Sequence, residues 1–432
     1  MGLLDAVLPD GRRWTRVGDC FEVTRKPRGL RVAEHETVPF VPMEAIPQGG
    51  HYEPQYDTKP STHITSGTYF ERGDLLIAKI TPSFENGKQA WAEGLPAPFG
   101  YATTEVIPLR PNAPGNDRRL LFFYLLHPEI RSFVSERMEG STGRQRVPEQ
   151  VLLELPYPGL PPEDQRIIAD TLERITRQIE LEERSARTAG GLKRSAMREL
   201  FTRGLRGEPQ KETEIGPVPE SWDTVSLDSI CGATGQVDLT TEADRRIHYI
   251  DVSSVSRESL AISTTNEYVL RDAPGRARKR VRTGDVIFAT IRPTLCRIAR
   301  IPPELDNHVC STAFCVLRTD NPDGLGKFIY YTVQRAEFIN LLAKIQTGAS
   351  YPAVTDRQVK SQIIPIPVKD ERDQIVAILD AIDRKIDLHR KKRAVLEELF
   401  KVLLHKLMTG EIRVDDLNLS ALEPQRVALA AP

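Results

Sequence analysis

The sequence predicts an α/β protein: two α+β domains with mixed, twisted sheets, together with two long antiparallel helices that form a coiled coil. Three observations lead to this prediction. Segments of the first half recur in the same order in the second half, at offsets of 207 to 211 residues. Each copy contains short apolar runs bounded by turn residues, as strands do. Each copy also ends in a long stretch whose apolar residues have helical spacing. We therefore expect an internal duplication with pseudo-twofold symmetry.

Composition limits the classes of function. The 432 residues carry 59 Lys and Arg against 60 Asp and Glu, so any attraction to nucleic acid must come from local basic patches. The five cysteines form no CxxC pair and have no histidine at zinc-finger spacing, which predicts no metal site, no disulfide framework and a cytoplasmic location. No run approaches the roughly 18 apolar residues of a membrane span, so we expect no membrane association.

The clearest repeat is a strand that follows a Gly-Asp turn. Residues 73–82 (GDLLIAKITP) align without a gap to residues 284–293 (GDVIFATIRP). Both runs end in proline, which cannot donate a ladder hydrogen bond and so marks the end of a strand. Residues 103–110 and 311–318 form a second pair of predicted strands. Each copy opens near a tryptophan, at Trp14 and Trp222, and these residues are expected to be core anchors.

A helix, a loop and a proline-rich stretch follow in each copy. Residues 121–138 and 328–345 are predicted to be helical, and each leads to a glycine-containing loop. These loops are residues 140–146 and 347–351. LPYPGLPPEDQ (155–165) and IPIPVKDERDQ (364–374) come next. Their prolines hold the backbone extended and their acidic residues suit a helix N-terminus, so a long helix is expected to begin in each.

The two long helices match each other at an offset of 207 residues. Apolar side chains at heptad spacing predict a coiled-coil seam. The seam residues are Leu172, Ile175, Ile179, Leu200, Leu379, Ile382, Ile386, Leu396, Phe400, Leu403 and Leu407. Gly190 and Gly191 let another helix approach closely, although each costs about 1 kcal/mol of helix propensity. We expect the two helices to pack antiparallel on each other.

At this level the chain resembles the specificity subunits of type I restriction-modification systems. The resemblance rests on the paired Gly-Asp-strand-Pro segments, on the proline stretches before the helices, and on the joint ETEIGPVPESW (212–222). It extends from Trp14 to about Arg413. It implies a DNA sequence-specificity subunit whose two target recognition domains each read half of a bipartite, asymmetric DNA target.

The resemblance and the repeats together divide the chain into six segments. They are target recognition domain 1 (1–155), spacer helix 1 (156–206), a linker (207–221), target recognition domain 2 (222–364), spacer helix 2 (365–413) and a C-terminal tail (414–432). The linker is rich in glycine, proline and charge and has no apolar period, so we expect it to be exposed. Two related readers suit duplex DNA, because half-sites one turn apart, about 34–36 Å, face the same side. A helix of about 30 residues spans about 45 Å, enough to set that separation.

The resemblance also implies the partners and the absence of catalysis. The partners are double-stranded DNA, two methyltransferase subunits and, in the full complex, restriction subunits. S-adenosylmethionine, ATP and Mg are expected on those subunits, and no cofactor on this chain. The sequence agrees, because it has no GxxxxGK[ST] loop, no HExxH, and no Asn-Pro-Pro-aromatic motif for a target amine. We therefore predict a non-catalytic recognition subunit.

Candidate DNA contacts come from basic and hydrogen-bonding residues in the two copies, because cations anchor phosphates and bidentate donors read base edges. They lie in the basic run 275–282, at the strand ends and in the glycine loops. The candidates are Lys79, Lys88, Arg144, Gln145, Arg146, Arg276, Arg278, Lys279, Arg280, Arg282, Arg292, Arg297, Ser350 and Tyr351. Each has a structural alternative. The basic run is equally suited to a solvated turn, and the glycine loops to helix C-caps.

Two other functions remain open from sequence. One is the separate specificity subunit of a simpler system, in which modification and cleavage share one partner polypeptide. The other is a protein-protein scaffold, with two interaction modules on a coiled coil and no DNA recognition. DNA binding that weakens steeply with salt distinguishes recognition of DNA from a scaffold.

Overall fold

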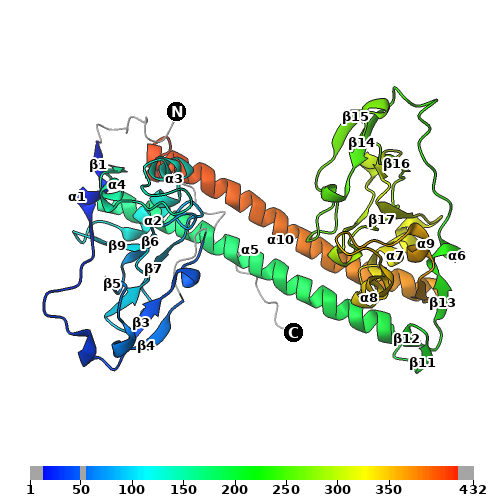
Figure 1. The fold of residues 1–432 in the computed structure, drawn as a ribbon, viewed down its shortest axis with the longest axis horizontal. Helices are drawn as coiled ribbons and strands as arrows, with labels where there is room; N and C mark the ends of the chain where they lie inside the picture. The colour runs from blue at the N-terminus through cyan, green and yellow to red at the C-terminus, as the bar shows by residue number, and fades with distance from the viewer. Residues whose placement is uncertain (1–12, 49–54, 417–432) are drawn as a thin grey trace. The chain divides into compact units, whose positions relative to one another are not determined.

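The computed structural model describes residues 13–48 and 55–416 (Figure 1). The chain forms two compact units: unit 1 comprises Met1–Arg184 and Arg390–Pro432, and unit 2 comprises Ser185–His389. Two long helices, α5 (Pro162–Arg203) and α10 (Lys369–Thr409), each contribute one part to each unit. The predicted long helices are therefore confirmed, and both begin within the proline-rich stretches.

Unit 1 is an α+β domain with two four-stranded sheets. Its strands are β1 (Trp14–Arg16), β2 (Phe21–Val23), β3 (Thr37–Val41), β4 (Asp57–Pro60), β5 (Thr68–Glu71), β6 (Leu75–Ala78), β7 (Gln89–Trp91), β8 (Phe99–Ala102), β9 (Val106–Pro111) and β10 (Pro156–Pro158). Its shorter helices are α1 (Val17–Cys20), α2 (Arg118–Leu126), α3 (Pro128–Ser135) and α4 (Glu149–Leu153). The sheets have the orders β2-β9-β6-β7 and β4-β3-β8-β5, and β1 pairs with β10.

Unit 2 contains the second copy. Its strands are β11 (Gln210–Thr213), β12 (Gly216–Pro219), β13 (Asp223–Ser226), β14 (Arg246–Ile250), β15 (Asn266–Val269), β16 (Ala277–Arg280), β17 (Val286–Ala289), β18 (Ile298–Arg300), β19 (Val309–Ser311), β20 (Phe314–Leu317) and β21 (Ile363–Ile366). Its shorter helices are α6 (Leu227–Ile230), α7 (Lys327–Thr332), α8 (Ala336–Ile345) and α9 (Asp356–Lys360). The main sheets have the orders β15-β14-β19-β16 and β18-β17-β20, and β13 pairs with β21.

The strand pairing confirms the internal duplication. The sheet β4-β3-β8-β5 has one parallel pair, β3 with β8, between two antiparallel pairs. The sheet β15-β14-β19-β16 repeats this pattern, with β14 parallel to β19. In the other sheet the Gly-Asp strands β6 and β17 each lie between two antiparallel neighbours. Each unit is thus a mixed-sheet α+β domain, as predicted.

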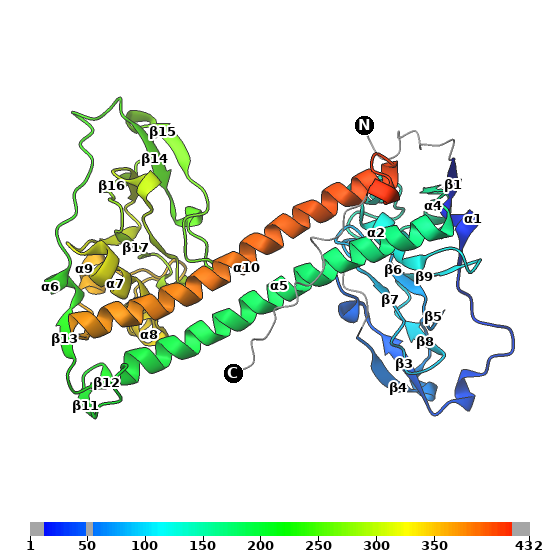
Figure 2. The same cartoon turned by 180° about the vertical axis from the view of Figure 1, so that it is seen from behind.

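Part of α5 packs beside part of α10 within each unit (Figure 2). In unit 1 the N-terminal part of α5 contributes Leu172 to a core that also holds Leu404 and Leu407 of the C-terminal part of α10. In unit 2 the C-terminal part of α5 contributes Phe201 to a core with Leu379 of the N-terminal part of α10. These pairings run antiparallel, as predicted.

All the predicted seam residues lie at least partly inside the protein. Those that are buried are Leu172, Ile175, Leu200, Leu379, Ile386 and Leu407, and those that are half-buried are Ile179, Ile382, Leu396, Phe400 and Leu403. The two predicted tryptophan anchors differ, since Trp222 is fully buried and Trp14 only partly.

The predictions of one continuous helix at 121–138 and of one at 328–345 were wrong. In the first copy α2 ends at Leu126 and α3 begins at Pro128, and in the second α7 ends at Thr332 and α8 begins at Ala336. Proline has no N–H for the helix ladder and disfavours helical backbone in the residue before it. The linker 207–221 also contains a regular element, the hairpin β11–β12, whose turn includes Gly216 at a φ of +97°. Glycine adopts this left-handed backbone without a Cβ penalty.

The Glu371 side chain is a buried carboxylate at the start of α10. The side chain of Glu371 is 1% exposed and lies 3.8 Å from Nε of Arg206. It accepts hydrogen bonds from the backbone N–H of Leu205, at 2.7 Å, and from Nε1 of Trp222, at 3.2 Å. One carboxylate thus joins the residues after α5, the buried tryptophan and α10.

Glu371→Ala is expected to lower the free energy of unfolding by about 3 kcal/mol, because the buried Trp222 N–H and the backbone N–H of Leu205 lose their acceptor and Arg206 loses its counter-ion. Urea-induced unfolding of the full chain measures this. Glu398→Ala is the control, since the Glu398 side chain is 70% exposed and should matter by less than about 0.5 kcal/mol. A loss below about 1 kcal/mol for Glu371→Ala would contradict the role given to this carboxylate.

The aspartates of the two Gly-Asp turns differ in their surroundings. Asp285 of unit 2 forms an ion pair with Arg318, at 2.6 Å. Asp74 of unit 1 is 2% exposed and accepts a hydrogen bond from the N–H of Glu71 at 2.7 Å. Burial raises the pKa of Asp74 to about 6, although that hydrogen bond opposes the shift. The charged form of Asp74 is therefore disfavoured in the folded protein.

This shift predicts a pH dependence of stability with a definite sign. The folded state holds the Asp74 proton more tightly than the unfolded state. The contribution of Asp74 to the free energy of unfolding is therefore largest below about pH 4 and is lost as the pH rises to about 6. The stability difference between wild type and Asp74→Asn should change by up to about 3 kcal/mol between pH 4 and 7, in favour of the variant at pH 7. Unfolding of both proteins at several pH values measures it, and a constant difference would contradict the raised pKa.

Candidate nucleic-acid interface

In both units the glycine loop lies against the end of the Gly-Asp strand. In unit 1, Ile80 forms a β-bridge with Arg146, and the N–H of Thr81 donates to the carbonyl of Gln145 at 3.0 Å. In unit 2, Ile291 forms a β-bridge with Ala353. The structure therefore brings together two segments in each copy that the sequence suggested separately.

The unit 1 loops gather cations around one carboxylate. Arg146 donates to both oxygens of Glu105, at 2.6 and 2.8 Å. This hydrogen-bonded pair lowers the pKa of Glu105, with Lys79 and Arg144 contributing by charge. Arg144 and Arg146 are exposed, and Gln145 is half-buried. Because three cations face one acid, the cluster can bind an anion such as a phosphate.

The unit 2 loops present a cation and an aromatic ring. The Arg292 guanidinium lies 4.9 Å from the ring centroid of Tyr351. It also donates to the carbonyl of Ser350, at 3.3 Å. Tyr351 is 71% exposed. An exposed ring beside an arginine can stack on a base or hold a phosphate, so this cluster can also contact nucleic acid, through different side chains.

The basic run 275–282 is largely engaged with the protein itself. Lys279 is paired with Asp356 and donates to the carbonyl of Phe314. Arg280 is paired with Glu242. Arg278 is half-buried, whereas Arg276 and Arg282 are exposed. The residues of this run that are accessible to a ligand are thus its two ends.

Two further candidates support neighbouring loops. Lys88 Nζ donates to the carbonyl of Met43 at 2.8 Å. Arg297 Nη1 donates to the carbonyls of Val252 and Val255, at 2.9 and 2.5 Å. Both side chains hold backbone in place, and both are partly buried. Their contacts give them a structural role that sequence alone did not reveal.

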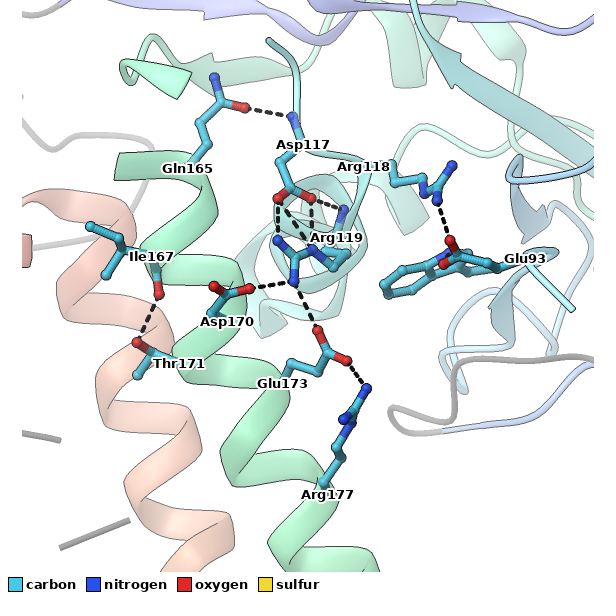
Figure 3. A network of polar contacts seen from close by, with 11 residues as sticks. Glu93, Asp117, Arg118, Arg119, Gln165, Ile167, Asp170, Thr171, Glu173 and Arg177 are labelled. Carbon is cyan, nitrogen blue, oxygen red and sulfur yellow. Dashed lines mark hydrogen bonds and ion pairs between the residues drawn. The ribbon is translucent and has the colours of Figure 1, made fainter. Parts of the chain in front are cut away.

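A polar network that was not predicted from the sequence fixes the unit 1 domain to its long helix. Arg119 of α2 is paired with Asp117, at 2.6 Å, with Glu173 of α5, at 3.0 Å, and with Asp170 of α5 (Figure 3). Glu173 in turn pairs with Arg177. Burial alone would lower the pKa of Arg119, but hydrogen bonds and charge from Asp117, Asp170 and Glu173 raise it.

In unit 2, a similar polar contact joins α7 to the long helix α10. Lys327 of α7 pairs with Asp380 of α10 at 2.5 Å, and Tyr331 OH donates to Asp380 at 2.7 Å. Asp380 aligns with Glu173 at the helix offset of 207. The sequence signal for these ion pairs was an acidic residue that recurs at the same position of the long helix in both copies.

The described residues include no helix that combines the length and the apolar character needed to cross a bilayer. Comparison with protein families gives a match over residues 219–398, to the type I restriction modification DNA specificity domain. Residues 219–398 are similar to that domain. The matched residues include β13 to β21 of unit 2 and most of α10.

Individual relatives extend the type I resemblance over more of the chain. The MjaVIII specificity subunit of Methanocaldococcus jannaschii is 25% identical over 333 residues, which cover 74% of this chain and 76% of the relative. The EcoAI specificity subunit of Escherichia coli is 33% identical over 182 residues, 41% of this chain and 30% of the relative. The matches confirm the predicted resemblance to type I specificity subunits. They also confirm the prediction of a non-catalytic recognition subunit.

Solved structures support the fold. The S subunit of the type I restriction-modification system of M. genitalium has a TM-score of 0.55 and 13% identity, covering 93% of this chain and 97% of that chain. A chain from a study of complex assembly and conformational transition of the type I R-M system has a TM-score of 0.54 and 20% identity, covering 94% and 100%. The type I specificity fold is therefore shared.

Proposed function

We propose that this type I specificity subunit reads a bipartite, asymmetric DNA target, with the unit 1 domain reading one half and the unit 2 domain the other. The observation that carries the proposal is the repeated junction of a strand end and a glycine loop, which holds exposed cations in both units. The two junctions carry different side chains, Arg144 and Arg146 in one and Arg292 and Tyr351 in the other. Because the two domains present different side chains, they recognise different half-sites.

We also propose the segment roles and partners of the complex. Residues 1–155 and 222–364 are the target recognition domains, and α5 and α10 are the spacers that set the distance between half-sites. Two methyltransferase subunits dock on this chain, and restriction subunits join in the full complex. S-adenosylmethionine, ATP and Mg belong to those partners, and the complex acts in the cytoplasm. The similarity to type I specificity subunits supports this assignment.

Co-expression of the chain with its genomic neighbours tests the function. Sequencing of the host DNA should show methylation at one two-part motif. Replacing residues 1–155 by the corresponding domain of a related subunit should change one half of that motif and leave the other intact. A change in both halves would contradict the proposal that each domain reads one half of the target. Complex formation without any methylation would favour the protein-protein scaffold.

A further inference from the structure

Three side chains that share no sequence motif meet inside unit 1. His127 lies between α2 and α3, Glu129 lies in the first turn of α3, and His405 lies in the C-terminal part of α10. One nitrogen or oxygen from each lies within 4.8 Å of the other two. His127 is 4% exposed, whereas Glu129 and His405 are half-buried. The cluster is separate from the loops proposed to contact DNA.

We propose that His127, Glu129 and His405 bind a divalent transition-metal ion such as Zn²⁺, which fastens α10 to the α2–α3 turn. Two imidazole nitrogens and a carboxylate oxygen form a common protein ligand set for zinc, with a fourth position left for water. The chemistry differs from that of a Mg²⁺ site, which is built from oxygen ligands.

The distances suit this ion. Nε2 of His127 lies 3.2 Å from Nδ1 of His405. Two nitrogens bound tetrahedrally to one zinc at about 2.0–2.1 Å are about 3.3 Å apart. Oε1 of Glu129 lies 3.9 Å from the same Nδ1, so a small shift of this half-buried side chain completes the set. The two histidines are thus already at the spacing of ligands that share an ion.

A second carboxylate supports His405 as a ligand. Oε1 of Glu411 lies 3.8 Å from Nε2 of His405, the ring nitrogen that does not face His127. Metal-binding histidines commonly turn their second ring nitrogen toward a carboxylate, which fixes the tautomer and raises the basicity of the ligating nitrogen. Glu411 is placed to do this when His405 ligates through Nδ1.

The metal-free cluster has its own hydrogen bonds, which compete with the ion. The N–H of Glu129 donates to Nδ1 of His127 at 3.3 Å, so the His127 proton sits on Nε2 and is directed at His405. Binding a metal through Nε2 moves that proton to Nδ1 and breaks the 3.3 Å hydrogen bond. No net proton is released by His127. We therefore expect reversible binding, weaker than at a structural zinc finger.

Titration of the full chain with ZnCl₂ in a calorimeter tests the proposal, and tetrahedral Co²⁺ absorption gives a second readout. Wild type should bind one equivalent. His405→Gln and Glu129→Gln should each lower the affinity by at least about tenfold. His63→Gln is the matched control, because His63 is an exposed histidine of unit 1 outside the cluster, and it should bind as wild type does.

Thermal unfolding separates metal binding from a folding defect. Zinc should raise the unfolding temperature of wild type and of His63→Gln, and should leave that of His405→Gln unchanged. His405 is only half-buried, so His405→Gln is expected to fold. Absence of saturable zinc binding by wild type, or wild-type affinity in both His405→Gln and Glu129→Gln, would overturn the proposal.

Discussion

Arg119→Ala is expected to destabilise unit 1 by about 3–5 kcal/mol, because it removes the one cation that faces three carboxylates. The Arg119 side chain is 20% exposed and that of Glu173 is 14% exposed. Water therefore solvates the Glu173 carboxylate poorly once the Arg119 guanidinium is removed. Asp117 also caps α2 by accepting from the N–H of Arg119, at 2.8 Å, which fixes the helix start at the same point. Urea-induced unfolding of the full chain measures the loss.

Arg177→Ala is the matched control for Arg119→Ala. Arg177 contacts the same Glu173, but its side chain is 70% exposed, and exposed ion pairs on helices contribute less than about 1 kcal/mol. Arg119→Lys keeps the charge but cannot bridge several carboxylates with one planar group, so an intermediate loss is expected. Equal, small losses for Arg119→Ala and Arg177→Ala would show that the network does not hold the domain on α5.

The sequence predicted the elements whose signals are local. Gly-Asp turns and terminal prolines marked β6 and β17, and apolar periodicity marked α5 and α10. Pairing between distant strands left no comparable signal. The parallel partner of β3 is β8, about 60 residues later, and nothing in either strand encodes that choice. Pro128 did carry a signal for the helix break, but the apolar run across it outweighed that signal in the prediction.

The candidate site was predictable in residue type and less so in accessibility. The repeats indicated that the glycine loops of the two copies correspond, but not that Arg146 bridges to Ile80, 66 positions earlier. Lys279 and Arg280 look alike in a basic run, yet each is held by an acid from elsewhere in the fold. A sequence shows where cations are, whereas their distant partners decide which remain available to a ligand.

The double variant Arg292→Ala/Tyr351→Ala is expected to abolish recognition of one half of the DNA target. An arginine contact and a stacked ring each contribute about 1–3 kcal/mol, so the pair should weaken specific binding by about 30-fold or more. Both side chains are exposed at the loop junction, and neither belongs to a core cluster, so the fold should persist. Binding of the assembled complex to a duplex that carries the methylated motif measures the loss.

A charge-matched control distinguishes this effect from a general loss of attraction. Arg257→Ala removes an exposed arginine of unit 2 outside the loop junction and should leave the motif unchanged. The double variant should also reduce the salt dependence of binding by about one counter-ion if Arg292 contacts a phosphate. The unit 1 loops keep Arg144 and Arg146, so any residual methylation should still require the other half-site. Loss of both half-sites together would mean that the two junctions do not read DNA independently.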